Sequence, residues 1–309
     1  MLPTKQQWAE VAGALLLTCI AFHLTCAILA DEATPRRSVV LVAGETAKVD
    51  KLGHHDYLAG CQCLEILLKQ TPGIDVTQVT EGWPTDESIL DKANSIVFYT
   101  DGGGKQAFLA NPQRVAKIQA LVDAGVGVVM LHQAVDYPEE FAAQAQGWLG
   151  GVYLNSRSGR GHWDSKHVDF PDHPIARGVT PWEINDGWLN ALAFVDNMEG
   201  IIPLVWSGKE YAGSRAGLDG DIVGWAYLRP RATQGTTNSS GPGRSFSFTG
   251  LDAHAAWSLP GMRQLVVNGV LWTAGVEIPS QGAPCEIEAD RLEALQTPRQ
   301  AKPPLSAKQ

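Results

Sequence analysis

Histidine, aspartate and glycine residues follow directly after four separate apolar runs of this 309-residue chain. Histidine is the side chain best suited to proton transfer and metal ligation near neutral pH, and aspartate can join it as a metal ligand. The residue types therefore indicate a site that moves protons or holds a divalent metal ion. The residues concerned are Glu45 and His55 after the first run, Asp101, Gly102, Gly103 and Gly104 after the second, His132 and Gln133 after the third, and Asp252 and His254 after the fourth.

The four apolar runs predict strands of a parallel sheet, because they are short, β-rich and separated by stretches of helical periodicity. Strand and helix alternate along the first half of the chain, which is typical of a doubly wound α/β sheet. In such a sheet the carboxyl ends of the strands share one edge, and ligands bind in the crevice there. We expect strands at residues 38–42, 75–80, 95–100, 127–131 and 245–249, and helices at 56–70, within 81–94, at 111–124 and at 260–274, the last of them amphipathic.

Residues 148–235 interrupt this order with a segment rich in Gly, Trp, Asp and His. Its short β-rich runs predict an elaborated insertion that carries antiparallel strands. Within it, His162 could supply a hydrogen bond while Trp163 offers a stacking face to a sugar ring. Asp186 and Trp188 are further candidates for substrate binding. The β-rich runs lie at residues 168–170, 191–195 and 222–228.

The turn after the third apolar run is where some α/β enzymes place a serine or cysteine nucleophile. Here the turn carries His132 and Gln133, and the sequence holds no GxSxG, HExxH or CxxC motif. Acyl transfer through serine or a thiol is therefore disfavoured, and His132 is left as acid, base or ligand. The glycines at 102–104 match no nucleotide-binding motif, but their backbone could approach a ligand closely.

Composition and the two ends of the chain bound its partners and its location. A formal net charge of −9 without a cluster of Lys or Arg argues against nucleic acid as a partner. Residues 1–30 carry an uncharged apolar stretch, which predicts a signal peptide or, alternatively, an uncleaved membrane anchor, and hence an exported protein of the periplasm or cell envelope. Residues 279–309 are polar and contain proline, so we expect a disordered tail. The α/β domain is expected between them, at residues 36–278.

A set of short motifs spans residues 38–278 in a consistent order. The motifs lie at residues 53–56, 82–84, 95–104, 128–136, 150–151, 162–163, 173–179, 243–250 and 268–272. Together they resemble the ThuA-like (trehalose utilisation) family. The resemblance implies a flavodoxin-like fold similar to that of class I glutamine amidotransferases, without their cysteine nucleophile and without their activity. It also implies a role in bacterial sugar metabolism, notably that of 3-keto-glycosides.

Two segments depart from the pattern of that family. Where the family typically has Asp-Glu-Trp-Tyr, this chain has Asp-Gly-Trp-Leu at residues 186–189, losing an acid and a phenol. Where the family has Gly-Gly-His-x-His-Trp, this chain has Gly-Leu-Asp-Ala-His-Ala at residues 250–255, losing one histidine and an aromatic ring. The departures leave two functions open, an enzyme with a changed substrate and a non-catalytic module that binds a sugar or a partner.

The residues and the resemblance together predict a carbohydrate-active protein that binds a sugar or 3-keto-glycoside at the carboxyl edge of the sheet. A 3-keto sugar has an acidified C–H beside its carbonyl, so a histidine base and a stabiliser of the enolate oxygen would support a lyase, hydrolase or isomerase. His132 and His55 are the candidates for base or acid, completed by Asp252 and His254. The backbone amides of residues 102–104 could stabilise the enolate oxygen, or a divalent metal ion held by His and Asp could replace them as Lewis acid. The expected substrate-binding residues are Glu45, Asp101, Gly102, Gly103, Gly104, Gln133, His162, Trp163, Asp186 and Trp188.

Overall fold

The computed structural model describes residues 36–45, 53–208, 222–230 and 243–296. Residues 1–36 and residues 37–309 form two separate units, and the fold described here is that of the second unit. The expected export segment, residues 1–30, lies outside the described residues, as does the end of the expected tail, residues 297–309. Within the described ranges, no helix combines the length and the apolar character that crossing a membrane requires.

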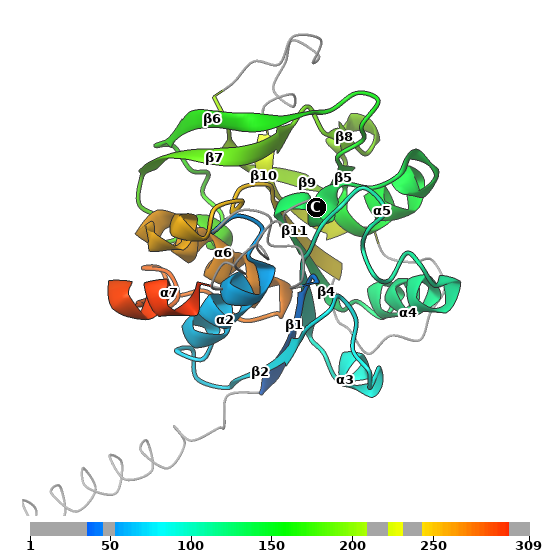
Figure 1. Cartoon of the computed structure of the whole chain (residues 1–309), viewed down its shortest axis with the longest axis horizontal. Helices are drawn as coiled ribbons and strands as arrows, with labels where there is room; N and C mark the ends of the chain where they lie inside the picture. The colour runs from blue at the N-terminus through cyan, green and yellow to red at the C-terminus, as the bar shows by residue number, and fades with distance from the viewer. Residues whose placement is uncertain (1–35, 46–52, 209–221, 231–242, 297–309) are drawn as a thin grey trace, which may run out of the picture. The chain divides into compact units, whose positions relative to one another are not determined.

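The strands of the central sheet are β1 (Arg37–Ala43), β2 (Ile74–Val79), β3 (Ser95–Tyr99), β4 (Gly127–Leu131), β9 (Ile201–Trp206), β10 (Ile222–Arg229) and β11 (Gly243–Phe248). They pair in the order β2-β1-β3-β4-β11-β10-β9 (Figure 1). The first five strands in this order run parallel, while β10 and β9 add antiparallel pairs at one end. The order β2-β1-β3-β4 is that of flavodoxin-like sheets, so the predicted mainly parallel, doubly wound fold is confirmed.

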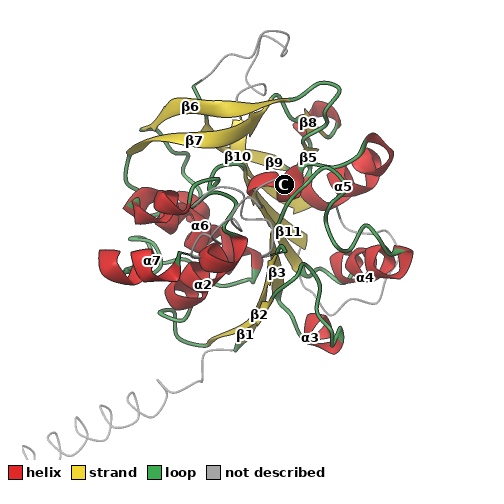
Figure 2. Cartoon of the chain, viewed as in Figure 1, coloured by secondary structure: helices red, strands yellow, loops and turns green. Residues whose placement is uncertain are grey.

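The helices are α2 (Tyr57–Leu68), α3 (Ser88–Asp91), α4 (Pro112–Asp123), α5 (Ala142–Leu149), α6 (Pro260–Thr273) and α7 (Ala289–Leu295). Helices α2, α6 and α7 lie on one face of the sheet, and α4 and α5 lie on the other (Figure 2). Successive strand residues point to opposite faces, so β1 contributes Leu41 to the first core and Val42 to the second. Burial on both faces explains why the strands are apolar throughout rather than alternating.

The parallel strands end level with one another at the carboxyl edge. Ala43 of β1 pairs with Tyr99 of β3, Tyr99 pairs with Leu131 of β4, and Leu131 pairs with Phe248 of β11. The segments that follow these four residues therefore leave the sheet side by side. This register brings together residues that are up to two hundred positions apart in the sequence, as the strand pattern predicts.

The insertion holds antiparallel strands, as expected. β6 (Gly159–His167) and β7 (Trp182–Asn190) form a two-stranded ribbon, and the short strands β5 (Gly151–Val152) and β8 (Ala193–Phe194) form another. The strand expected at residues 168–170 is absent, because the ribbon's pairing ends at His167 with Trp182. Val168 is exposed, and Pro171 lies directly beyond this segment.

Helix α6 is not amphipathic as predicted, because every residue from Gly261 to Thr273 is buried. Its polar side chains are satisfied inside the protein. Asn268 donates to the backbone carbonyl groups of Ile175 and Arg177, and Arg263 donates to the carbonyl group of Cys285. The segment after α6 folds back over the helix and covers the face that was expected to meet solvent.

The predicted disordered tail is wrong for residues 279–296, which are ordered and packed on the domain. Leu292 of α7 is buried in the core that α2 and α6 share. Gln70, just after α2, exchanges two hydrogen bonds with the backbone of Glu286. Few apolar residues suffice here, because backbone hydrogen bonds to the domain offset the ordering entropy.

Candidate functional site

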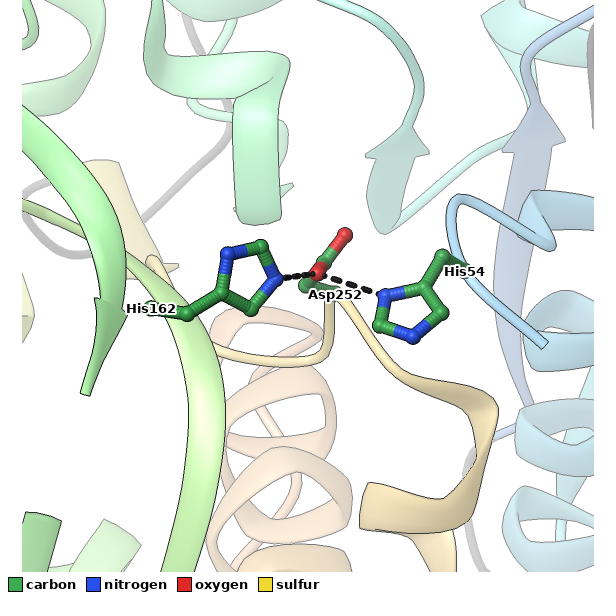
Figure 3. Close-up of side chains that lie close together, drawn as sticks. All are labelled: His54, His162 and Asp252. Atoms are coloured by element: carbon green, nitrogen blue, oxygen red, sulfur yellow. Dashed lines mark hydrogen bonds and ion pairs between the residues drawn. The ribbon is translucent and has the colours of Figure 1, made fainter. Parts of the chain in front are cut away.

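Four histidines surround the carboxylate of Asp252 at the carboxyl edge of the sheet. Oδ2 of Asp252 lies 2.8 Å from Nδ1 of His54 and 2.6 Å from Nε2 of His162, as Figure 3 shows. Oδ1 lies 2.8 Å from Nε2 of His55 and 3.4 Å from Nε2 of His132. One buried carboxylate thus contacts four imidazole rings, and we call these five residues the histidine cluster.

Each member of the histidine cluster comes from a different place in the fold or from a turn of its own. His54 and His55 precede α2, whose N-terminus is capped by the Asp56 side chain. His132 directly follows β4, His162 lies on β6 of the ribbon, and Asp252 follows β11. The convergence of these segments was predicted from the parallel topology, except for the ribbon.

Two of these histidines occupy a strained backbone conformation. His55 has a φ of +51° and His132 has a φ of +53°, in the left-handed region that residues other than glycine seldom adopt. Such conformations persist only where the surroundings enforce them, and they concentrate at functional sites. For His132 the strain marks the sharp turn out of β4 that the sequence predicts.

Asp186 holds the loop that carries Asp252. Its two carboxylate oxygens accept hydrogen bonds from the backbone N–H groups of Leu251, Ala253 and Gly187, at 2.7, 3.1 and 2.9 Å. The loop is further fixed because the backbone N–H of His55 donates to the carbonyl of Asp252 at 2.9 Å. Asp186 itself is only 1% exposed. The structure therefore gives Asp186, expected as a substrate-binding residue, a place behind the loop instead.

The imidazoles set the charge of Asp252. Burial alone would raise the pKa of its carboxyl group, but the contacts with His132, His55 and His54 reverse this and hold the pKa well below its usual range. Burial raises the pKa of Asp186, and the charge of His132 and three backbone N–H groups oppose that shift. Asp252 is thus a carboxylate at every pH at which the fold is expected to operate.

Two of the imidazoles are also held from behind. Nδ1 of His132 lies 2.9 Å from the carbonyl oxygen of Thr249. Nδ1 of His55 lies 3.8 Å from Asp101, whose carboxylate also accepts a hydrogen bond from the Tyr57 hydroxyl at 2.7 Å. Partners of this kind fix the ring orientation and the tautomer of histidines that bind metals or move protons.

The histidine cluster contains two sets of side chains that could hold a metal ion. One set is His54, His162 and Asp252, the other is His55, His132 and Asp252, and the ligand atoms within each set lie within 4.8 Å of one another. Imidazole nitrogen and carboxylate oxygen suit several divalent transition-metal ions. The metal ligation that the residue types predict is therefore sterically available.

Several expected binding residues lie elsewhere. Gln133 reaches the cluster, with its Nε2 3.3 Å from Nε2 of His55, but His254 does not. His254 is buried, and its Nε2 lies 3.1 Å from the carbonyl oxygen of Leu292 in α7. Glu45 and Asp101 border a cavity of about 20 Å³ beside the ends of β1 and β3, which has room for one water-sized group.

The expected pairing of His162 with a stacking face on Trp163 does not occur. Neighbouring residues on a strand point to opposite faces, so Trp163 faces the domain core while His162 faces Asp252. Trp163 packs against Trp188 with ring centroids 6.4 Å apart, and Trp188 is 1% exposed. Both indole rings therefore contribute to packing, and neither lies beside the cluster as a platform.

The glycine loop after β3 is tied into its own hydrogen bonds. The N–H of Gly103 donates to the carbonyl of Asp136 at 2.8 Å, and the N–H of Gly104 donates to the Gln106 side chain at 3.2 Å. These two amides are therefore not available to an enolate oxygen as expected. A Cβ on Gly102 would lie 2.1 Å from the carbonyl oxygen of Gln133, so glycine is required there for close packing against the His132 turn.

The sequence pattern missed His54 and the ion pair between Arg160 and Asp136. Nη1 of Arg160 lies 3.1 Å from the Asp136 carboxylate, and burial raises the pKa of Asp136 to about 6 despite the opposing charge of Arg160. The alternation of β6 could have indicated Arg160, because residues two apart on a strand share a face. It therefore lies on the same face of the ribbon as His162.

A larger cavity lies away from the histidine cluster. Its volume is about 430 Å³, and it lies between the end of α2, α6 and residues 277–286. No histidine lines it, and its charged residues are Glu277 and Glu286. The site is therefore assigned by the convergence of ionisable groups rather than by cavity size.

Comparison with known families decides the relationship. The family model described as ThuA, trehalose utilisation, matches residues 39–273. The chain belongs to the ThuA family. A search of curated proteins finds no match.

Among solved structures, a protein described as ThuA-like from Bacteroides uniformis ATCC 8492 is similar at 13% identity and a TM-score of 0.51, over 82% of this chain and 96% of that one. PurLQS from Thermotoga maritima aligns at 14% identity with a TM-score of 0.43, over 77% of this chain and 97% of that one. At such identities the first likeness supports the fold alone, and the second carries no argument.

The two departures from the ThuA pattern touch each other in the structure. A Cβ built on Gly187 would lie 2.7 Å from Oδ2 of Asp252. A side chain at position 187 would therefore occupy the space that the Asp252 carboxylate fills. Gly187 also pairs with His162 across the ribbon, so both departures lie at the centre of the histidine cluster. Their contact indicates that one acid has been exchanged for another nearby, rather than two independent losses.

Proposed function

We propose that this ThuA-family protein binds a sugar or 3-keto-glycoside at the carboxyl edge of the sheet and acts on it by histidine-mediated proton transfer. The observation that carries the proposal is the meeting of four imidazoles with one buried carboxylate at the edge where α/β sheets bind ligands. A keto group acidifies the neighbouring C–H, which a positioned imidazole can then deprotonate.

His162 is the base in this proposal. Its Nε2 lies 2.6 Å from Asp252, and its side chain is 52% exposed. Asp252 orients the ring and stabilises the imidazolium, as a carboxylate does in catalytic triads, while Nδ1 accepts the proton. His132, the first candidate from the sequence, is 2% exposed, so its ring reaches Asp252 more readily than a substrate.

The proton transfer leads to three related reactions. The electron pair of the C–H bond moves onto the keto oxygen and forms an enolate, while His162 carries the proton. Return of the proton to another carbon isomerises the sugar, and expulsion of the group on the next carbon makes the protein a lyase, or a hydrolase once water adds. A divalent metal ion in the cluster would supply a Lewis acid for the enolate oxygen.

The test is turnover of a 3-keto-glycoside by the full chain and by two matched variants. His162→Gln is expected to lower kcat by about 10³-fold, within the range for loss of a general base. His173→Asn is expected to leave kcat unchanged, because His173 lies outside the cluster and Asn keeps the side-chain acceptor that caps the turn at Ile175.

A non-catalytic sugar-binding module is the alternative outcome. Such a module would gain thermal stability from the sugar and yield no product even as wild type. Product formation unaffected by His162→Gln would remove His162 from the mechanism.

Export to the periplasm or cell envelope is part of the proposal, and the uncharged apolar stretch in residues 1–30 supports it. N-terminal sequencing of protein from the envelope fraction of the native host is expected to begin near Ala27 or Ala30. A chain that begins at Met1 in the membrane fraction would indicate an uncleaved anchor instead. Intact chain recovered only from the cytosol would contradict export.

A further inference from the structure

The two halves of the histidine cluster differ in how they meet Asp252. On the Oδ2 side, both contacts are hydrogen bonds, with His54 at 2.8 Å and His162 at 2.6 Å. On the Oδ1 side, His55 and His132 lie at ion-pair distances of 2.8 and 3.4 Å, but Oδ1 has no hydrogen-bond partner. The first half is satisfied by protons, whereas the second half is not.

His132 gives the clearest sign of a missing cation. The carbonyl oxygen of Thr249 can only accept, so Nδ1 of His132 carries the proton and donates at 2.9 Å. In the neutral ring Nε2 then has a lone pair, and this lone pair faces Oδ1 of Asp252 at 3.4 Å. Both atoms are buried, and neither has a hydrogen bond. Two buried acceptors that face each other are costly unless a cation lies between them.

The other ring on this side is arranged in the same way. Nε2 of His55 points to Oδ1 of Asp252, and Nδ1 points back to the Asp101 carboxylate at 3.8 Å. A carboxylate or carbonyl behind a histidine is typical of metal ligands, because it raises the basicity of the ring. The His55 side chain is 36% exposed, so one face of the set remains open to a substrate.

We propose that a divalent transition-metal ion binds to His55, His132 and Oδ1 of Asp252, while His54 and His162 keep their hydrogen bonds to Oδ2. The ligands are two imidazole nitrogens and one carboxylate oxygen, a set that binds Zn²⁺ and similar ions and leaves further coordination positions for substrate. The inference deepens the proposed function, since it divides the cluster into a cation half and a proton half. The open positions of the cation would then face the keto oxygen.

The experiment measures Zn²⁺ binding by the full chain after treatment with a chelator, using titration calorimetry and metal analysis. One Zn²⁺ per chain is expected for the wild type. His132→Gln and His55→Gln are each expected to weaken binding by more than about 100-fold, since loss of a ligand should exceed the loss seen when only an outer partner is removed. His54→Gln and His162→Gln are expected to keep one Zn²⁺ with less than about tenfold change.

His173→Asn serves as the control and should bind as the wild type does, and circular dichroism confirms that each variant is folded. Equal loss of Zn²⁺ in all four cluster variants would overturn the division into halves, as would two Zn²⁺ per chain. Absence of Zn²⁺ binding by the wild type would overturn the cation site itself. The measurement contains no sugar, so its outcome is separate from that of the turnover assay, which tests the proposed function.

Discussion

Strand β6 carries two histidines whose surroundings are opposite. His162 faces the Asp252 carboxylate with a half-exposed side chain, whereas His167 is 4% exposed and packs between Trp182 and Trp188, at ring-centroid distances of 4.8 and 5.3 Å. Burial lowers the pKa of His167 to about 4, so this ring stays neutral. The five-residue spacing places the two rings on opposite faces of the ribbon.

The comparison teaches that a buried counter-charge, more than residue type, separates a chemical histidine from a structural one. His167 hydrogen-bonds to the neutral hydroxyl of Ser165 at 2.8 Å, and no item of charge lies among its printed contacts. His162 meets a carboxylate that three other imidazoles also contact. Changes around Asp252 should therefore alter chemistry, and changes around His167 should alter stability alone.

The largest expected effect comes from removing the charge of Asp252. Asp252→Asn keeps the size of the side chain but leaves four imidazoles without their carboxylate. We expect kcat for a 3-keto-glycoside to fall by about 10³-fold or more, because the base loses its orienting partner. His167→Gln is the control from the other face of the ribbon and should retain wild-type kcat. Turnover of Asp252→Asn within tenfold of wild type would break the comparison.

The contact between Gly187 and Asp252 offers a sharper test. Gly187→Glu should lower kcat by about 10²-fold, because the new side chain displaces the Asp252 carboxylate by about an ångström or more. Adding Asp252→His restores the residues that the ThuA pattern has at both positions and should recover part of this loss. A double variant that is no more active than Gly187→Glu alone would show that the two positions are not exchanged as a pair.

Asp186 should affect both stability and turnover through the loop that it holds. Asp186→Asn keeps one acceptor oxygen but turns an amide N–H group toward a backbone N–H. We expect a loss of about 1–3 kcal/mol in the free energy of unfolding, which urea denaturation measures. We also expect kcat to fall by about tenfold with KM little changed, because Asp252 moves while substrate contacts remain. An unchanged kcat in a destabilised variant would mean that the loop position does not matter for turnover.

The smallest effect on chemistry is expected at His167, where only stability should depend on pH. The pKa of His167 is lower in the folded than in the unfolded protein, so the unfolded chain binds more protons between pH 6.5 and about 4. Stability should therefore fall as the pH falls through this window, by about 3 kcal/mol for the full shift. Urea denaturation of wild type and His167→Gln at several pH values measures this. An equally steep loss in the variant would assign the dependence to other groups.

The sheet and its carboxyl edge could be predicted from the sequence because a buried parallel strand is apolar along its whole length. Ser95–Tyr99 and Gly127–Leu131 show this without ambiguity. Parallel topology then requires that His55, His132 and Asp252 gather at one edge. No knowledge of side-chain contacts is needed for that step.

Other features depend on contacts that the sequence pattern does not carry. Trp163 points away from His162 because both lie on one strand, which was not evident before the ribbon's register was known. Asp186 binds the backbone of a loop 65 residues away. His254 follows the fourth run as closely as Asp252 does, yet the ordered helix α7 covers it. Each of these depends on the tertiary packing of the ribbon or of the segment after residue 278.

The most direct test of the central claim is hydrogen exchange at the carbon beside the keto group of a 3-keto-glycoside. The proton spectrum of the sugar in D₂O reports the loss of this hydrogen whether or not a later step occurs. If His162 and Asp252 act as base and orienting carboxylate, the wild type and His173→Asn should exchange this hydrogen rapidly, and His162→Gln should reduce the rate to near that of the sugar alone. Equal exchange by His162→Gln and wild type, or a wild type that binds the sugar without exchange, would contradict the account.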